Sequence, residues 1–278
     1  MFRKIYYLLS PVMRRIVRRI WFFPIDVYKW MTGKQEKLIP PQGLIFTGTG
    51  DFKKIGERLV NSFIMDCNLQ PTDKVLDIGC GIGRIARPLT NYLHGDGAYY
   101  GFDPVEQGIN WCTRKYADFP NFHFKYIPLR NDLYNLSARA IPAEFSFPYP
   151  SHLFDLVVLV SVFTHMQEAD VRRYFFEIAR VLKTGKTCFC TLFLITHESD
   201  AYLKKTANPF FTIRHDNYFL HDARVKDANI AYKYEVIEEM INAAGMKIKT
   251  FIPGWWAGRP PDESLDYQDV LIIVLNLD

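Results

Sequence analysis

A glycine-rich turn between a short apolar strand and a helix constrains this chain more than any other feature. Residues 74–78 are typical of a buried strand, and glycines follow at positions 79, 81 and 83. Residues 84–93 carry apolar side chains at helical spacing, which predicts a helix that begins at the last glycine. Glycines let backbone N–H groups approach a ligand closely, and a helix N-terminus adds unpaired donors and partial positive charge. The sequence therefore predicts a binding site for a polar ligand at this corner.

Two classes of ligand use such a corner. Gly81-x-Gly83-x-x-Ala86 matches the looser dinucleotide fingerprint, which would make the chain a dinucleotide-dependent oxidoreductase. Asp77 argues against a dinucleotide, because its carboxylate would repel a pyrophosphate and attract an ammonium or sulfonium group. In the run Asp77-x-Gly79-x-Gly81-x-Gly83, every fixed position resembles the first motif of the class I S-adenosylmethionine-dependent methyltransferases. The resemblance implies S-adenosyl-L-methionine as the cofactor.

A second acidic residue follows at a matching distance. Residues 98–103 are typical of a strand that ends in Asp103, twenty positions after Gly83. A carboxylate at this point can accept hydrogen bonds from both ribose hydroxyls, and the resemblance assigns Asp103 that task. Asp103 is also suited to cap a helix over residues 105–116, with Pro104 at its first position. Both roles are compatible.

The order of elements predicts the fold. Strands and helices alternate from residue 74 to residue 195, which indicates a parallel sheet with right-handed crossovers. A helix and two more strands follow, so the whole resembles an α/β, Rossmann-like, seven-stranded, mostly parallel sheet with an antiparallel last strand and helices on both faces. We expect one domain over residues 41–278, with an aromatic-rich, lid-like insert over residues 196–231.

Residues 1–40 form a separate N-terminal segment. Residues 1–30 hold seven lysines and arginines against one aspartate, so the net charge of +4 is concentrated there and a nucleic-acid-binding core is not indicated. Apolar residues recur at helical spacing from Ile5 to Phe23, and the uninterrupted apolar run is too short for a spanning helix. The pattern predicts a basic amphipathic helix on an anionic membrane surface, or a helix that packs on protein, with a break or a kink at Pro11 and Pro24.

Cysteine usage bears on localisation. Five cysteines without a Cys-x-x-Cys pair are typical of free thiols in a reducing compartment. We therefore expect a cytoplasmic protein, peripheral on a membrane if the helix binds one. The sequence does not indicate an oligomeric state.

The predicted cofactor site draws on the ends of several strands, where open α/β sheets bind ligands. It comprises Gly50, Asp51, Asp77, Gly79, Gly81, Gly83, Asp103, Arg130, Asn131 and Ser161. His165 and His197 follow the fourth and fifth strands and are the candidate general bases, because histidine titrates in the suitable range. The pattern predicts no metal site.

These observations favour methyl transfer to an oxygen of a small molecule or glycan, with a lipid-linked acceptor if the N-terminal helix binds membrane. Two alternatives stay open: the oxidoreductase, and a membrane scaffold that keeps a methyltransferase fold without activity.

Overall fold

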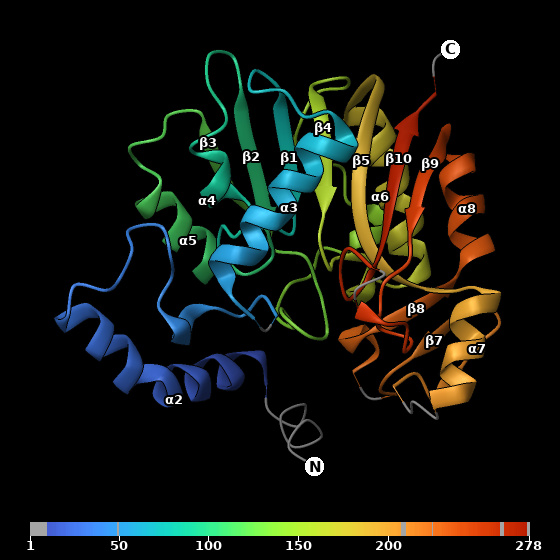
Figure 1. Cartoon of the computed structure of the whole chain (residues 1–278), viewed down its shortest axis with the longest axis horizontal. Helices are drawn as coiled ribbons and strands as arrows, with labels where there is room; N and C mark the ends of the chain where they lie inside the picture. The colour runs from blue at the N-terminus through green and yellow to red at the C-terminus, as the bar shows by residue number, and fades with distance from the viewer. Residues whose placement is uncertain (1–9, 49, 207–209, 224, 262–263, 277–278) are drawn as a thin grey trace.

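A mostly parallel sheet forms the centre of the molecule (Figure 1). The computed structural model describes residues 10–48, 50–206, 210–223, 225–261 and 264–276. Seven strands run side by side in the order β3 (Phe122–Tyr126), β2 (Ala98–Asp103), β1 (Lys74–Ile78), β4 (Phe154–Leu159), β5 (Leu182–Ile195), β10 (Asp269–Leu275) and β9 (Met246–Ile252). Only β10 is antiparallel to its neighbours, so the predicted fold class is confirmed.

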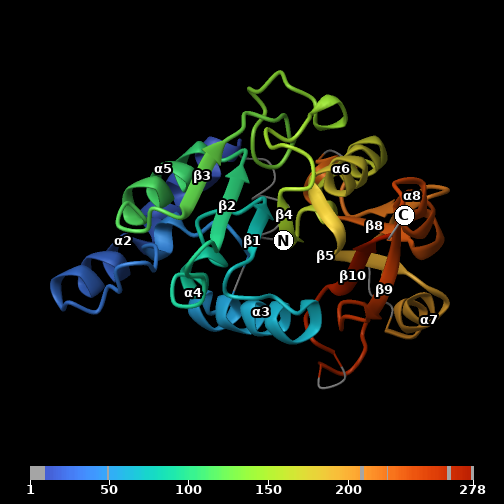
Figure 2. The ribbon, with the colours of Figure 1, turned by 90° about the horizontal axis from the view of Figure 1, so that it is seen from above.

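Helices cover both faces of this sheet (Figure 2). One face packs against α3 (Phe52–Cys67), α4 (Ala86–Leu89) and α5 (Glu106–Lys115). The other packs against α6 (Glu168–Val181) and α8 (Tyr234–Ala243). Double coverage explains why β4 is apolar and buried along almost its whole length. Because helices cover both faces of the sheet, polar groups gather at the carboxyl ends of the strands.

The helix after the glycines is shorter than predicted. Residues 81–85 form turns, and α4 spans only Ala86–Leu89, so the expected helix over residues 84–93 is wrong in length. Pro88 accounts for the late start, because it has no N–H to donate to the carbonyl of Arg84.

The insert extends the sheet instead of standing apart from it. Strand β5 pairs with β10 through Leu192 and then with β8 (Ile230–Lys233) over Phe193–Ile195. β8 pairs with β7 (Tyr218–Leu220), and β7 with β6 (Ile213–Arg214). Within the described residues the sheet therefore has ten strands, three more than the sequence predicts. The lid role of this insert, which also contains α7 (His197–Thr206), stays a prediction.

The N-terminal segment contains one long helix, α2 (Pro11–Met31), while Ile5 and the rest of residues 1–9 lie outside the described residues. Helix α2 begins at Pro11, with Ser10 as its N-cap, and continues past Pro24, so Pro24 does not end it. The Asp26 carboxylate accepts hydrogen bonds from the backbone N–H groups of Gln42 (2.7 Å) and Gly43 (2.9 Å), which fasten the helix to the main domain. No helix in the described ranges is long and apolar enough to cross a membrane.

Candidate functional site

A cavity of about 940 Å³ lies at the carboxyl ends of the parallel strands. Its wall combines residues of β1, β2, β4, β5 and β10 with residues of the N-terminal segment and of the insert. Ligand pockets in proteins range from roughly 300 to 1,000 Å³. The cavity is therefore large enough for a cofactor together with an acceptor.

The three glycines shape the turn beside the cavity, and Gly79 lines it. Gly79, Gly81 and Gly83 all have left-handed backbones, with φ of +73°, +60° and +81°, which only glycine adopts readily. A Cβ on Gly81 would lie 2.3 Å from Cγ2 of Thr47, so any side chain would crowd the turn. Thr47 Oγ1 is buried without a hydrogen-bond partner among the described residues, and Thr47 lines the cavity. A backbone cradle beside an unpaired buried hydroxyl fits a polar ligand group.

Asp103 joins the end of β2 to the glycine turn. Its Oδ2 accepts from the Gly81 N–H at 2.8 Å and its Oδ1 from the Val105 N–H at 2.7 Å. Burial raises the pKa of Asp103 to about 6, although these two hydrogen bonds lower it in part. Helix α5 begins at Glu106 with Val105 as the N-cap, so the predicted capping role of Asp103 is wrong. Each carboxylate oxygen keeps a further lone pair for a ligand hydroxyl.

Asp77 and Arg84 place opposite charges on the same side of the cavity. Asp77 Oδ2 accepts from the Tyr99 hydroxyl at 2.7 Å, and burial raises the pKa of Asp77 to about 7. Arg84 Nη1 donates to the Thr47 carbonyl oxygen at 2.9 Å, and burial lowers the pKa of Arg84. Sequence reasoning missed Arg84, although it directly follows the third glycine. Together the two side chains suit a ligand that carries both an ammonium and a carboxylate group.

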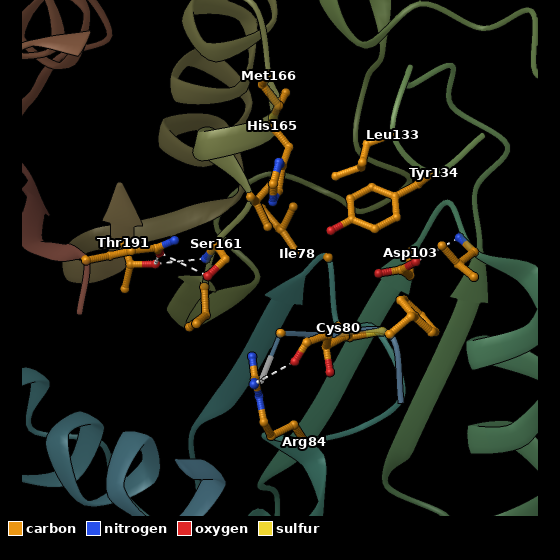
Figure 3. Close-up of a pocket in the computed structure, with 18 of the residues that line it drawn as sticks. Ile78, Cys80, Arg84, Asp103, Leu133, Tyr134, Ser161, His165, Met166 and Thr191 are labelled. Carbon is orange, nitrogen blue, oxygen red and sulfur yellow. Dashed lines mark hydrogen bonds between the residues drawn. The ribbon is translucent and has the colours of Figure 1, made fainter. Parts of the chain in front are cut away.

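His165 lies across the cavity, next to the tyrosine ring of the loop after β3. Its Nδ1 lies 2.8 Å from the carbonyl oxygen of Asp227. A carbonyl can only accept, so this hydrogen bond assigns the proton to Nδ1 and leaves Nε2 as an acceptor in the neutral ring. Burial lowers the pKa of His165, which favours the neutral form at pH 7. Figure 3 shows the rings of His165 and Tyr134 in one part of the cavity, with centroids 5.5 Å apart.

The structure brings together most, but not all, of the predicted site residues. Gly50, Asp51, Arg130, Asn131 and Ser161 line the cavity together with Asp77, Gly79, Asp103 and His165. Gly81 and Gly83 shape the turn behind them. Asp51 also caps α3 through the N–H groups of Lys53 and Lys54.

His197 does not join this group. It is the first residue of α7, its side chain is exposed, and it is absent from the cavity wall. The reason is the length of β5, which continues past the edge of the main sheet to pair with β8 and so carries His197 away. Its predicted place beside His165 is therefore wrong.

Asn131, predicted as a cofactor-site residue, uses its side-chain amide to bind the protein's own backbone. Its Oδ1 accepts from the N–H groups of Leu133 and Tyr134 at 2.9 and 3.1 Å. Its Nδ2 donates to the His165 carbonyl oxygen at 2.8 Å. The amide thus holds the loop after β3 and fixes the backbone of His165.

A polar cluster of which the sequence predicted only Ser161 faces the cavity beside β4 (Figure 3). Ser161 has a left-handed backbone (φ +61°), and its N–H donates to Thr191 Oγ1 at 2.8 Å. Gln268 Oε1 lies 2.9 Å from Ser161 Oγ and 2.6 Å from Thr191 Oγ1. Trp255 lines the cavity nearby, whereas Trp256 is buried and donates its indole N–H to Asp269 at 2.7 Å. These residues form a wall against which an acceptor can be held.

Metal ligands do not gather at this edge. Within the described ranges, no group of three or more histidine, cysteine, aspartate or glutamate side chains is placed to hold a metal ion. All five cysteines are buried free thiols.

Comparison with known proteins agrees with this geometry. Residues 76–190 match the family model described as "Methyltransferase domain". An uncharacterized methyltransferase of Schizosaccharomyces pombe is 25% identical over 122 residues, which span 44% of this chain and 40% of that protein. The match therefore covers less than half of this curated relative.

Solved structures share the fold. An S-adenosylmethionine-dependent methyltransferase of Methanosarcina mazei aligns with a TM-score of 0.54 and 19% identity, over 77% of this chain and 97% of its own. Another from Clostridium acetobutylicum aligns with a TM-score of 0.52 and 14% identity, over 91% and 100%. At these identities the likeness concerns the fold alone.

Proposed function

We propose that this chain, whose residues 76–190 match a methyltransferase domain, transfers a methyl group from S-adenosyl-L-methionine to an oxygen of its acceptor. One observation carries this proposal: Gly79 of the glycine turn, two buried carboxylates and a neutral histidine line a single cavity. When bound, the cofactor would supply an electrophilic methyl group on a cationic sulfur. The protein would then have to position the acceptor next to the methyl group and remove the proton of the acceptor hydroxyl.

The residues present suit the functional groups of this cofactor. The Asp103 carboxylate would accept hydrogen bonds from the ribose hydroxyls, while it stays held by Gly81 and Val105. Asp77 would attract the ammonium group and Arg84 the carboxylate of the methionine end, because both charges border the cavity. The left-handed glycines would let backbone N–H groups approach without an intervening Cβ.

His165 is the group we assign to the acceptor hydroxyl. With Nδ1 committed to the Asp227 carbonyl, Nε2 would take the hydroxyl proton as the oxygen bonds to the methyl carbon. Its lowered pKa keeps the ring neutral, and thus able to accept, near pH 7. The Ser161–Thr191–Gln268 cluster and Trp255 would orient a small molecule or a sugar of a glycan on the same side.

A lipid-linked acceptor and peripheral membrane association belong to the same proposal. Support comes from α2, which bears large apolar side chains on its exposed face. Five free cysteines indicate a reducing compartment. A protein bound to the cytoplasmic side of a membrane would be in such a compartment.

Two measurements test the proposed function. Calorimetric titration with S-adenosyl-L-methionine and with NAD should show binding of the first only. Binding of NAD alone would restore the oxidoreductase alternative. The protein should then transfer label from methyl-tritiated cofactor into a cell extract, and fractionation into lipid, glycan, protein and nucleic acid would identify the acceptor class. Cofactor binding without transfer to any fraction, membrane lipids included, would favour the inactive scaffold.

A further inference from the structure

We infer that the outer face of α2 docks on an anionic lipid bilayer and brings the mouth of the cavity to that surface. The acceptor is then an amphiphile that stays in the bilayer while its polar head enters the cavity. The statement about the acceptor rests on the proposed function, whereas the docking itself does not.

Helix α2 packs on the protein with its polar side. Arg14 is only 5% exposed, and its Nη1 donates to the Leu133 carbonyl oxygen at 3.1 Å. Arg15 Nη1 lies 3.4 Å from the Tyr134 carbonyl oxygen, and Arg18 Nε lies 3.3 Å from the Gln42 carbonyl oxygen. Surface helices usually bury an apolar stripe and expose their charges. Here the orientation is reversed.

The reversal exposes a continuous apolar surface, which we call the α2 outer face. Ile20, Trp21 and Trp30 are 70%, 77% and 76% exposed. The other exposed large apolar residues of this helix are Val12, Met13, Ile16, Val17, Phe23, Ile25, Tyr28 and Met31. A surface of this size is costly in water and marks an interaction site.

The charges around the outer face select an anionic membrane as its occupant. On α2 itself Arg19 is exposed and Lys29 is half-buried, and the exposed Lys34 and Glu36 follow the helix. The sole acidic residue of α2, Asp26, is turned inward and bound by Gln42 and Gly43. Exposed tryptophans and cations without exposed acids are what a helix in the interface of an anionic bilayer requires. A second copy of the chain would instead set like charges against each other.

The same helix forms part of the wall of the cavity. Pro11, Arg14 and Arg15, from its first two turns, line the cavity. The carbonyl groups that Arg14 and Arg15 bind belong to Leu133 and Tyr134, which line it too. The ring of Tyr134 in turn meets His165 edge-on. Figure 1 shows α2 running past the end of the central sheet. Since its first two turns line the cavity, a bilayer under the outer face would lie beside the cavity.

Vesicle sedimentation tests the docking. Full-length protein should pellet with vesicles that contain phosphatidylglycerol and stay in solution with pure phosphatidylcholine. The triple variant Ile20→Ser, Trp21→Ser, Trp30→Ser should lower the bound fraction roughly tenfold or more. Met65→Ser is the matched control, because Met65 is 81% exposed but lies on α3. Equal binding by the triple variant and the wild type would overturn the inference.

Site-directed labelling tests the geometry. Since all five cysteines are buried, a cysteine introduced at Met13, Trp30 or Met65 can be labelled selectively with a polarity-sensitive fluorophore. Phosphatidylglycerol vesicles should shift the emission at positions 13 and 30 to the blue and leave position 65 unchanged. A shift at position 30 alone would show that the end of the helix at the cavity stays in water, and would overturn the proposed route.

Two further readouts separate the possible failures. Calorimetric titration of the triple variant with S-adenosyl-L-methionine should match the wild type. Cofactor binding with no vesicle binding would overturn the docking and leave methyl transfer standing, and vesicle binding with no cofactor binding would do the reverse. Sedimentation equilibrium without lipid should give a monomer. A dimer that the triple variant abolishes would assign the outer face to a second copy instead.

Discussion

Gly108 offers a sharp test of how the glycine turn is held in place. It lies in the first turn of α5, directly behind the turn. A Cβ at this position would be 2.3 Å from the Gly81 carbonyl oxygen and 3.0 Å from Cζ of Phe46. Ordinary contact begins at 3.4 Å, so the helix and the turn have to separate by about 1 Å in Gly108→Ala.

Two effects of this substitution oppose each other. Alanine in place of glycine stabilises a helix by at most about 1 kcal/mol, whereas overpacking against a fixed neighbour costs typically about 1–3 kcal/mol. The obstruction is a backbone carbonyl, which cannot swing away like the end of a side chain, so the second effect should dominate. We expect a net loss of up to about 2 kcal/mol in the free energy of unfolding. Separation should also lengthen the 2.8 Å hydrogen bond from Gly81 N to Asp103. Loss of a hydrogen bond to a charged group, worth about 1.5 kcal/mol or more, predicts at least about tenfold weaker cofactor binding.

Urea denaturation without cofactor and calorimetric titration with S-adenosyl-L-methionine measure the two effects separately. Asn110→Ala is the control, because Asn110 is exposed on the same helix. It should gain a few tenths of a kcal/mol in stability and keep the affinity of the wild type. If Gly108→Ala is as stable as the wild type and binds the cofactor equally well, the close contact between α5 and the turn does not constrain the site.

The remaining predictions concern the polar residues of the cavity. Asp103→Ala should weaken cofactor binding by about 1–3 kcal/mol and also lower the urea midpoint, because two backbone N–H groups lose their acceptor; calorimetry that shows unchanged affinity would remove Asp103 from the site. Because the pKa of Asp77 is about 7 without ligand, its carboxyl is protonated below that pH, so affinity for the cationic cofactor should rise as pH increases through 7 and level off above it. Titrations from pH 5.5 to 8.5 check this rise, and an equal slope in Asp77→Asn would refute the assignment to Asp77. His165→Ala should lower turnover by roughly 10²–10⁴-fold while calorimetry shows cofactor affinity within about twofold of the wild type, and an active variant would exclude His165 as the base. With the pKa of His165 lowered, the basic form is lost only as pH falls below the usual value of about 6.5, so turnover measured against pH should hold its plateau to that point.

The core of the cofactor site could be predicted because its pattern is local. Asp77, the glycines and Asp103 lie on two successive strands and one turn, and parallel pairing of β1 with β2 brings the ends of both strands to one edge. Ser161 could be predicted because it follows β4, but its partners Thr191 and Gln268 could not. Their place beside Ser161 depends on β10, the last strand in the chain, lying next to β5, and no local pattern specifies that contact.

The N-terminal helix illustrates a different limit. Helical spacing separates an apolar side from a basic side, but it does not say which side meets the protein. The usual preference would turn the apolar side inward. In the structure, carbonyl groups of the loop after β3 accept hydrogen bonds from Arg14 and Arg15, and these partners lie more than a hundred residues away in the sequence. Only the tertiary structure could therefore decide the orientation.

The double pairing of β5 has a consequence for how acceptor preference can diverge. Phe193 lines the cavity and pairs with Ala231 of the insert, whereas Thr191, two residues earlier, pairs with β10. Changes in the length or sequence of the β6–β7 hairpin can reshape the acceptor wall through β8 and Phe193. Strands β1 and β2, which carry the cofactor residues, lie on the far side of β4 and need not move. One half of the cavity is thus free to vary while the other half is kept.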